Sequence, residues 1–314
     1  MIPIRAIFCA ILVFAASTAG AQAPTAPSAQ LAQYWVDLGV LAADDMQGRA
    51  PGEAGGLRAR GYIKGRLAEI GVTRFTEDFE HRFDVRDETG RLRPAANLVG
   101  FVPGTQNGRP YIVVTAHYDH LGVRNGQVFN GADDNASGVA ALLALAAEAR
   151  RNPFQHPLVF AALDGEEGGL RGAYAFVENP PIPRAQIALN INLDMVARAD
   201  DANLWVVGLH HHPQFRSTLQ TIPPQPLVRL AFGHDRPEQG DDDWTNQSDQ
   251  FAFHEAGIPF IFFSVENHAD YHQSTDDTDR IDPIVFDQAL QLIIVATRRL
   301  DAAMANGGKT PRTP

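Results

Sequence analysis

Two adjacent glutamates, Glu166 and Glu167, follow the apolar run "PLVFAA" in the stretch "LDGEEGGLRG". The run is typical of a buried strand, so both carboxylates are expected just beyond the end of that strand. Neighbouring like charges repel each other, and such a pair is not expected for stability alone. A bound metal ion would offset this repulsion, because its charge attracts both carboxylates.

Other side chains that can bind metal ions also end apolar runs or lie in the loops beyond them. They are His117, Asp119, His120, Asp133, Asp134, Asp194 and His272. Imidazole and carboxylate are ligands that suit zinc and neighbouring metals. A single one of these residues would more often be structural, but this many at strand ends predict a metal site. Their number predicts two metal ions about 3.5–4 Å apart, which a short, bidentate aspartate can bridge.

The hydrophobic pattern predicts the elements that position these residues. Helices are predicted over 31–46, 53–71, 136–151, 169–178 and 283–304, and strands over 97–104, 110–119, 157–164, 187–196, 204–209 and 257–265. Near-continuous apolar strands that alternate with helices indicate a largely parallel sheet covered on both faces, an α/β fold in three layers, α/β/α. Ligands bind beyond the carboxyl ends of such strands, which is where the candidate residues lie.

The chain has 314 residues, 45% of them hydrophobic, and a net charge of -11. The composition is that of an ordinary globular protein, and the acidic balance gives no support to nucleic-acid binding. Residues 1–21 have one basic residue, a short apolar run and small residues at the end, which predicts a signal peptide. We therefore expect an exported protein, periplasmic or extracellular, that has no membrane contact once the signal is removed.

The remaining chain is divided into a linker over 22–30, one domain over 31–305 and a flexible tail over 306–314. Cys9, the single cysteine, lies within the predicted signal peptide. The mature protein is therefore expected to have no disulfide, and its core and any bound metal must stabilise it. The sequence leaves the oligomeric state open.

Five motifs together resemble the co-catalytic dizinc exopeptidases of metallopeptidase family 28. They are His-x-Asp at 117–119, Gly-Ala-Asp-Asp-x-x-Ser-Gly at 131–138, Asp-Gly-Glu-Glu at 164–167, the aspartate after "NINL", and Asp-Tyr-His at 270–272. The similar region runs from "DDMQGRAPGEAGG" to "YHQSTDDTDRID", which is nearly the whole mature chain. The resemblance implies the zinc exopeptidase (phosphorylase/hydrolase-like) fold. It also implies two Zn²⁺ ions, with Co²⁺ or Mn²⁺ compatible with the same ligands, and aminopeptidase activity on peptides with a free N-terminus.

The resemblance also implies a role for individual residues. His117 and Asp194 would bind one metal, Glu167 and His272 the other, and Asp134 would bridge them. Asp134 is preferred over Asp133 because the bridging aspartate of the family lies four residues before the glycine of the Ser-Gly pair, here Gly138.

Two catalytic roles complete this assignment. Glu166 would be the general base that takes a proton from the attacking water and passes it to the leaving amine. Asp119 lies two residues after His117 and would share its face of the strand, so its carboxylate would accept the second imidazole N–H.

Three alternatives remain open within and beside this family. A glutaminyl cyclase would be an acyltransferase with one zinc, and such relatives usually have Trp before the final histidine, where this chain has Tyr271. A carboxypeptidase or dipeptidase would need clustered arginines, for which Arg171, Arg198 and Arg229 are scattered candidates. A non-catalytic binding homologue is disfavoured, because such relatives lose ligands or the base and none is lost here.

Four other segments have predictions of their own. The histidines at 210–212 are expected in an exposed loop. "GDDDWTN" at 240–246 is expected in a solvated acidic loop, with binding of a cation or lining of the substrate cleft as its alternatives. Asp249 is a candidate for supporting the site or contacting substrate. Tyr271 is expected either to contact substrate or to pack.

Overall fold

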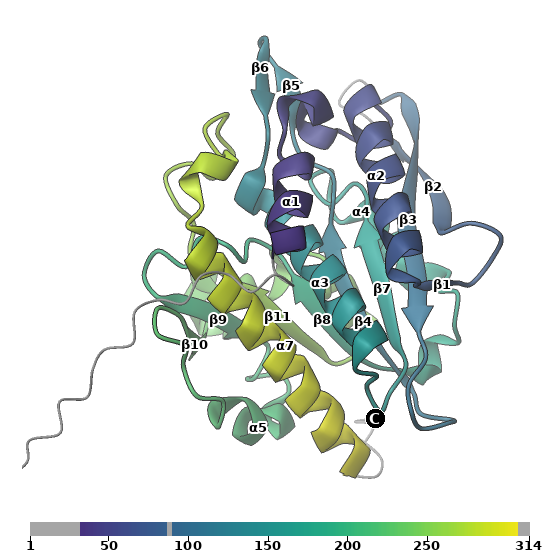
Figure 1. Cartoon of the computed structure of the whole chain (residues 1–314), viewed down its shortest axis with the longest axis vertical. Helices are drawn as coiled ribbons and strands as arrows, with labels where there is room; N and C mark the ends of the chain where they lie inside the picture. The colour runs from purple at the N-terminus through teal and green to yellow at the C-terminus, as the bar shows by residue number, and fades with distance from the viewer. Residues whose placement is uncertain (1–31, 87–89, 307–314) are drawn as a thin grey trace, which may run out of the picture.

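The computed structural model describes residues 32–86 and 90–306. The predicted signal peptide and linker, and all but the first residue of the predicted tail, lie outside these residues. Within them the chain forms a nine-stranded sheet in the order β1-β3-β7-β4-β8-β11-β9-β10, with β2 paired to β3 (Figure 1). The strands are β1 (Thr73–Arg74), β2 (Glu80–Arg86), β3 (Leu92–Val102), β4 (Tyr111–His117), β7 (Leu158–Leu163), β8 (Ile187–Leu193), β9 (Asn203–Val207), β10 (Arg229–Phe232) and β11 (Phe260–Ser264).

The middle of the sheet is parallel, and one antiparallel pair bounds it on each side. Strands β7, β4, β8 and β11 pair in parallel, so their carboxyl ends meet at one edge. β3 joins β7 antiparallel, and β9 joins β11 antiparallel. β7 is buried along its whole length, as its uninterrupted apolar sequence predicts for a strand covered on both faces. The expected α/β fold with a mostly parallel central sheet is therefore confirmed.

Helices cover both faces of the sheet and complete the three layers. On the face toward the viewer in Figure 1 lie α1 (Ala32–Leu41), α2 (Ala54–Ile70), α3 (Gly138–Arg151), α5 (Arg216–Gln220) and α7 (Pro283–Asn306). On the opposite face lie α4 (Arg171–Glu178) and α6 (Gln250–Glu255), which pack on each other. The large core lies under the first group and includes Leu142, Leu143 and Ile293, whereas Phe176 and Phe253 belong to the smaller core under the second.

Irregular segments connect these layers, and η2 lies at the edge where the parallel strands end. η1 (Asp44–Arg49) is a short 3₁₀ segment after α1, and η2 (Ala132–Ser137) is a wide turn directly before α3. The other short turns are η3 (Arg184–Gln186), η4 (Pro213–Phe215), η5 (Pro237–Asp242), η6 (Trp244–Asn246) and η7 (Thr278–Arg280). β5 (Gly122–Arg124) and β6 (Gln127–Phe129) form a separate hairpin between the end of β4 and η2.

The predicted elements agree with the structure except at the margins. The second helix ends where expected, because Gly71 adopts the left-handed conformation and its amide closes the last turn. The first predicted helix is shorter than expected, since α1 ends at Leu41 and is followed by η1. The hydrophobic pattern did not predict β1, β2, β5, β6, β10, α5 or α6, which are short or largely polar.

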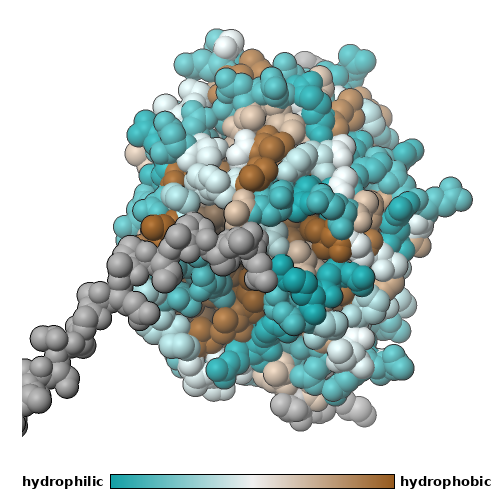
Figure 2. Space-filling view, in the orientation of Figure 1, coloured by the Kyte–Doolittle hydropathy of each residue, from teal (hydrophilic) through white to brown (hydrophobic). Residues whose placement is uncertain are grey.

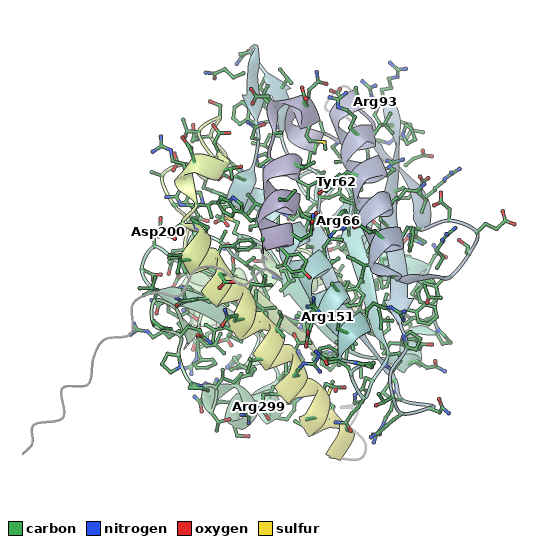
Figure 3. All side chains as sticks on the ribbon, viewed as in Figure 1. Tyr62, Arg66, Arg93, Arg151, Asp200 and Arg299 are labelled. Atoms are coloured by element: carbon green, nitrogen blue, oxygen red, sulfur yellow. The ribbon has the colours of Figure 1, made fainter. Side chains whose placement is uncertain are left out.

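One buried ionic contact joins α1 to α2. The Nε atom of Arg66 lies 2.8 Å from the Oδ1 atom of Asp37, and the Tyr62 hydroxyl donates to the same oxygen at 2.6 Å. Figure 3 labels Tyr62 and Arg66, the two α2 residues of this contact. Arg66 and Asp37 are both buried. On the molecular surface that faces the viewer in Figure 1, apolar side chains form small groups among hydrophilic ones (Figure 2).

Candidate metal centre

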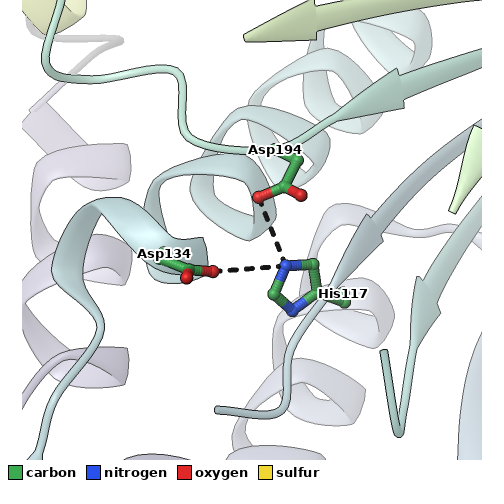
Figure 4. A group of neighbouring side chains, drawn as sticks. All are labelled: His117, Asp134 and Asp194. Carbon is green, nitrogen blue, oxygen red and sulfur yellow. Dashed lines mark hydrogen bonds and ion pairs between the residues drawn. The ribbon is translucent and has the colours of Figure 1, made fainter. Parts of the chain in front are cut away.

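His117 is the last residue of β4 and is almost completely buried at the edge where the parallel strands end. Its Nε2 atom lies 3.2 Å from Oδ1 of Asp194 and 3.4 Å from Oδ1 of Asp134 (Figure 4). Asp194 directly follows β8, the parallel neighbour of β4, and Asp134 lies within η2. The fold therefore brings three residues that are far apart in the sequence into one group of ligand atoms.

A second group shares Asp134 with the first. The Nε2 atom of His272 lies 3.1 Å from Oδ2 of Asp134 and 3.4 Å from Oε2 of Glu167. The Nδ1 atom of His120 lies 2.6 Å from Oε1 of Glu167 and 3.8 Å from Oδ2 of Asp134. The two carboxylate oxygens of Asp134 thus point to different groups, Oδ1 to His117 and Oδ2 to His120 and His272.

Close packing between η2 and the end of β8 explains how Asp134 reaches Asp194. A Cβ atom at Gly138 would lie 2.5 Å from the carbonyl oxygen of Leu193, so only glycine permits this approach. The Asn135 amide group donates to the Leu193 carbonyl at 3.0 Å, and its oxygen accepts the Gly138 amide at 2.9 Å. These contacts fix the turn that carries Asp134 against the strand that precedes Asp194.

The donor set fits a metal such as zinc. Each of the groups His117–Asp134–Asp194 and His120–Asp134–Glu167 offers three ligand atoms within 4.8 Å of one another. Imidazole nitrogens and carboxylate oxygens are common zinc ligands.

The ionisation of these groups is strongly perturbed. Burial alone would lower the pKa of His117, but Asp194, Glu166 and Asp134 raise it well above its usual value. Burial alone would raise the pKa of Asp134, but His120, His117 and His272 hold it well below its usual range. A carboxylate held ionised among imidazoles is suited to bind a cation.

Glu166 borders the same space as the ligands but makes different contacts. It lines a cavity of about 330 Å³ together with residues of both groups. Burial raises the pKa of Glu166 well above its usual value, and Asp194, Asp249 and Glu167 raise it further against the attraction of His117. A carboxyl group with a raised pKa, facing a cavity, is suited to take and return a proton.

The predicted contact of Asp119 with the imidazole of His117 requires a correction. The Nδ1 atom of His117 lies 3.1 Å from the backbone carbonyl oxygen of Asp119 but 3.8 Å from its carboxylate, which is too far for a hydrogen bond. The carboxylate instead accepts the backbone amides of Glu166 at 3.0 Å and Glu167 at 3.4 Å. The strand period places Asp119 near His117, but its carboxylate accepts hydrogen bonds from backbone amides of the neighbouring loop instead.

Asp133 points away from the two groups of ligand atoms. Its Oδ1 atom accepts the Ala197 amide at 2.8 Å, and its Oδ2 atom lies 3.3 Å from Nε2 of His268. The structure therefore places Asp134, and not its neighbour, among the candidate ligands.

Residues outside the two groups of candidate ligands form the remaining walls of the cavity. Leu170, Met195, Phe262, Val265 and Tyr271 give it an apolar side, and Trp244, Asn246 and Gln247 border it as well. The 240–246 segment thus follows its alternative prediction in part and lines the cavity. Tyr271 both lines the cavity and stacks on His272, with ring centroids 3.9 Å apart.

The histidines at 210–212 and Asp249 do not line the cavity. His210 is exposed as predicted, but His211 and His212 are half-buried and pack near Phe260. Asp249 is fully buried, and within the described residues neither of its carboxylate oxygens has a hydrogen-bond partner. Burial raises its pKa to about 7, and Asp194 raises it while His117 lowers it.

The three scattered arginines do not converge on the cavity. Arg171, Arg198 and Arg229 are not among the described residues that line it. Arg198 pairs instead with Asp200 and Asp270, at 2.8 Å and 2.7 Å.

Comparison with known proteins assigns the family. Residues 97–297 match the model of peptidase family M28, which is more than half of the chain, and the chain belongs to this family. It is 30% identical over 252 residues to leupeptin-inactivating enzyme 1 of Streptomyces exfoliatus, covering 78% of this chain and 51% of that protein. The chain therefore spans about half the length of this relative.

Solved structures share the fold. A zinc aminopeptidase from Bacillus subtilis superposes with a TM-score of 0.69 at 16% identity, covering 87% of this chain and 96% of the other. A glutaminyl cyclase from Bacteroides thetaiotaomicron superposes with a TM-score of 0.66 at 16% identity, covering 85% and 96%. Within residues 32–86 and 90–306, no helix has the length and apolar character needed to cross a bilayer.

Proposed function

We propose that this chain is a zinc-dependent aminopeptidase with two metal ions. The observation that carries the proposal is the position of the Asp134 carboxylate, whose Oδ1 lies 3.4 Å from His117 and whose Oδ2 lies 3.1 Å from His272. A carboxylate that faces two separate groups of ligand atoms is suited to bridge two cations. Membership of peptidase family M28 supports a hydrolase, and the Bacillus subtilis neighbour is a zinc aminopeptidase.

Five residues would hold the metal ions in this proposal. His117 and Asp194 would bind one ion, Glu167 and His272 the other, and Asp134 would bind both. When bound, zinc would polarise the scissile carbonyl and lower the pKa of a coordinated water toward about 7. His120 would orient Glu167 through its short contact at 2.6 Å.

The proton transfers belong to Glu166. Its carboxylate would take a proton from the attacking water and then give it to the leaving amine nitrogen as the C–N bond breaks. Asp119 would hold the base in place, because its carboxylate accepts the Glu166 amide at 3.0 Å. The perturbed pKa of Glu166 supports this role, since the base must both accept and return the proton.

The dimensions of the cavity support action at a chain end. A volume of about 330 Å³ lies at the lower end of the range for small-ligand sites, about 300–1,000 Å³. It has room for a terminal residue and its neighbouring peptide bond. The substrates would be peptides with a free N-terminus.

Export is part of the same proposal and rests on the leader pattern of residues 1–21. The test is N-terminal sequencing of the protein after expression in a bacterial host, with cells fractionated. Recovery from the periplasm or medium with the first 21 residues removed supports export, whereas an intact leader in the cytoplasm contradicts it.

The activity is tested with three peptides and purified, zinc-loaded mature protein. One peptide has a free N-terminus, the second is the same peptide N-acetylated, and the third begins with Gln. Stepwise loss of the first residue from the free peptide alone is expected. Loss of ammonia from the Gln peptide without shortening would make the protein a cyclase, and shortening from the other end would make it a carboxypeptidase. Zinc analysis of the same sample should give two ions per chain.

A further inference from the structure

Arg49 is a fully buried cation beside the metal centre. It ends η1 and precedes the segment that matches the family model. Its guanidinium donates to four backbone carbonyls, those of Leu41 at 2.7 Å, Tyr118 at 2.8 Å, Gly131 at 3.0 Å and Asn130. No carboxylate of the described chain lies within ion-pair distance of it. Burying a charge is costly even where backbone carbonyls accept all of its hydrogen bonds, so these contacts call for a role.

The carbonyls that Arg49 binds belong to the loops that carry the ligands. Tyr118 directly follows His117 at the end of β4. Asn130 and Gly131 lead into η2, where Asp134 lies. One planar guanidinium, with donors in a rigid fork, therefore fixes the distance between the first histidine and the shared aspartate.

Asp276 holds the same segment from the opposite side. It is fully buried and accepts the amide of Asp133 at 3.1 Å and the amide of Asp134 at 3.0 Å. Its backbone carbonyl accepts the Ala132 amide at 3.0 Å. Because Asp276 lies four residues after His272, these bonds connect the turn of the last histidine to η2.

The two side chains are complementary in charge and in the groups that they bind. Arg49 binds carbonyls of residues 130 and 131, and Asp276 binds amides of residues 133 and 134. The short segment that they hold carries the Asp134 carboxylate, which faces both groups of candidate metal ligands. Arg49 is also attracted to Asp134, Asp119, Asp276 and Glu167, so its charge offsets part of the repulsion among these carboxylates before a metal binds.

We propose that Arg49 and Asp276 are positioning residues that pre-organise the metal centre by clamping residues 130–134 from two sides. The inference rests on the proposed function, since it assumes that Asp134, His117 and His272 bind metal. Residues that orient metal ligands typically contribute about 10–100-fold to metal affinity. We therefore expect this size of effect on zinc dissociation constants, without loss of the fold.

Two conservative variants test the clamp. Arg49→Lys keeps the charge, but its single ammonium cannot reach all four carbonyls that the fork binds. Asp276→Asn keeps the size but replaces one acceptor oxygen with an N–H₂ group, which faces backbone N–H donors. Zinc affinity is measured by competition with a chromophoric chelator, and melting temperatures are measured for the metal-free and the zinc-loaded proteins.

The matched control is Asp37→Asn at the buried contact between α1 and α2. It removes one charge of a buried pair, as Asp276→Asn removes a buried charge, but the hydrogen-bond partners of Asp37 lie on α1 and α2 and not in a predicted ligand loop. We expect it to lower the melting temperature and to leave the zinc dissociation constant within about twofold of wild type. A variant that only weakens the fold would behave in the same way.

The expected result is a zinc dissociation constant weakened about 10–100-fold in Arg49→Lys and Asp276→Asn, with turnover restored by excess zinc. Zinc affinity equal to that of wild type, with only a lowered melting temperature, overturns the clamp. Arg49→Lys carries the test alone where Asp276→Asn does not fold. The wild-type protein tests the proposed function separately, because it either binds zinc and shortens peptides or does not, whatever the variants do.

Discussion

The Nδ1 atom of His120 lies 2.6 Å from the Oε1 atom of Glu167, although the two residues are 47 positions apart in the sequence. His120 is buried, and its ring lies edge-on to the ring of His272, with centroids 5.8 Å apart. Both histidines therefore approach Glu167, but they differ in exposure, since the His272 side chain is 38% exposed. This arrangement separates a histidine that orients Glu167 from one that faces the cavity.

His120→Asn and His272→Ala are expected to affect zinc binding differently. Asn at 120 can still donate to Glu167, although less directly, so zinc affinity should fall about 10–100-fold while both sites still fill at high zinc. His272→Ala removes a proposed ligand, and one of two zinc ions should be lost. Zinc per chain, measured after dialysis against a range of zinc concentrations, checks both. One ion lost in His120→Asn and none in His272→Ala would exchange the two roles.

Glu166→Gln tests the proposed base. The amide cannot accept a proton, so turnover should fall about 10²–10⁴-fold while zinc content and melting temperature stay those of wild type. Steady-state kinetics on a peptide with a free N-terminus measure the loss. Turnover like that of wild type would remove Glu166 from the mechanism.

Glu167→Ala is the neighbouring comparison. This variant should lose zinc rather than only turnover, because the carboxylate is a proposed ligand. It also leaves His120 without its 2.6 Å partner. Zinc content by atomic emission distinguishes the two glutamates, and full occupancy in Glu167→Ala would contradict the assignment of the ligands.

Trp244 is expected to contribute to substrate binding. It lines the cavity and stacks on His234 with ring centroids 3.7 Å apart and planes 7° from parallel. Trp244→Ala should raise KM about tenfold with little change in kcat, because loss of about 1.4 kcal/mol of apolar contact corresponds to this factor.

Trp244→Phe is the control for this prediction. It retains an apolar wall and should raise KM less than the alanine variant does. Initial rates over a range of peptide concentrations separate KM from kcat. An unchanged KM in Trp244→Ala would place the bound peptide elsewhere in the cavity.

Local patterns in the sequence were sufficient to predict the sheet and the convergence of the candidate ligands. β7 is apolar throughout and β4 and β8 are mostly apolar and buried, and parallel strands bring the residues at their carboxyl ends to one edge. His117 and Asp194 could therefore be placed together without a structure. Strand β2 has no such apolar run, because four of its seven side chains are charged and only Val85 is buried.

The sequence pattern could not predict the roles of side chains that bind backbone groups of distant loops. Arg49 and Asp276 bind carbonyls and amides of other loops, and which loops meet depends on packing between distant segments. The Asp119 carboxylate was misplaced for the same reason, since the strand period gives its face but not the amides that it meets. The sequence placed His120 at a strand end, but no local sequence pattern predicted its contact with Glu167.

Asp301 is expected to stabilise the fold above acidic pH. It is buried on α7 and accepts hydrogen bonds from the amides of Gln155 at 2.8 Å and His156 at 2.9 Å, and its Oδ1 lies 2.7 Å from the Nδ1 atom of His156. Burial alone would raise the pKa of Asp301, but the hydrogen bonds from His156 and Gln155 lower it below its usual value. A depressed pKa in the folded state means that the ionised carboxylate stabilises the protein above the unfolded pKa of about 3.9, and that this stabilisation is lost as the pH falls through the folded value.

Asp301→Asn should therefore lower the free energy of unfolding by about 1–3 kcal/mol at pH 7. The difference from wild type should shrink as the pH falls below about 4, where the wild-type carboxyl group becomes protonated. Urea unfolding of both metal-free proteins at a series of pH values measures it. Asp287→Asn on the same helix is the matched control, because burial raises the pKa of Asp287 and its ionised form costs stability at pH 7. That variant should be neutral or slightly stabilised, and a loss of the same size in both variants, unchanged with pH, would contradict the role given to Asp301.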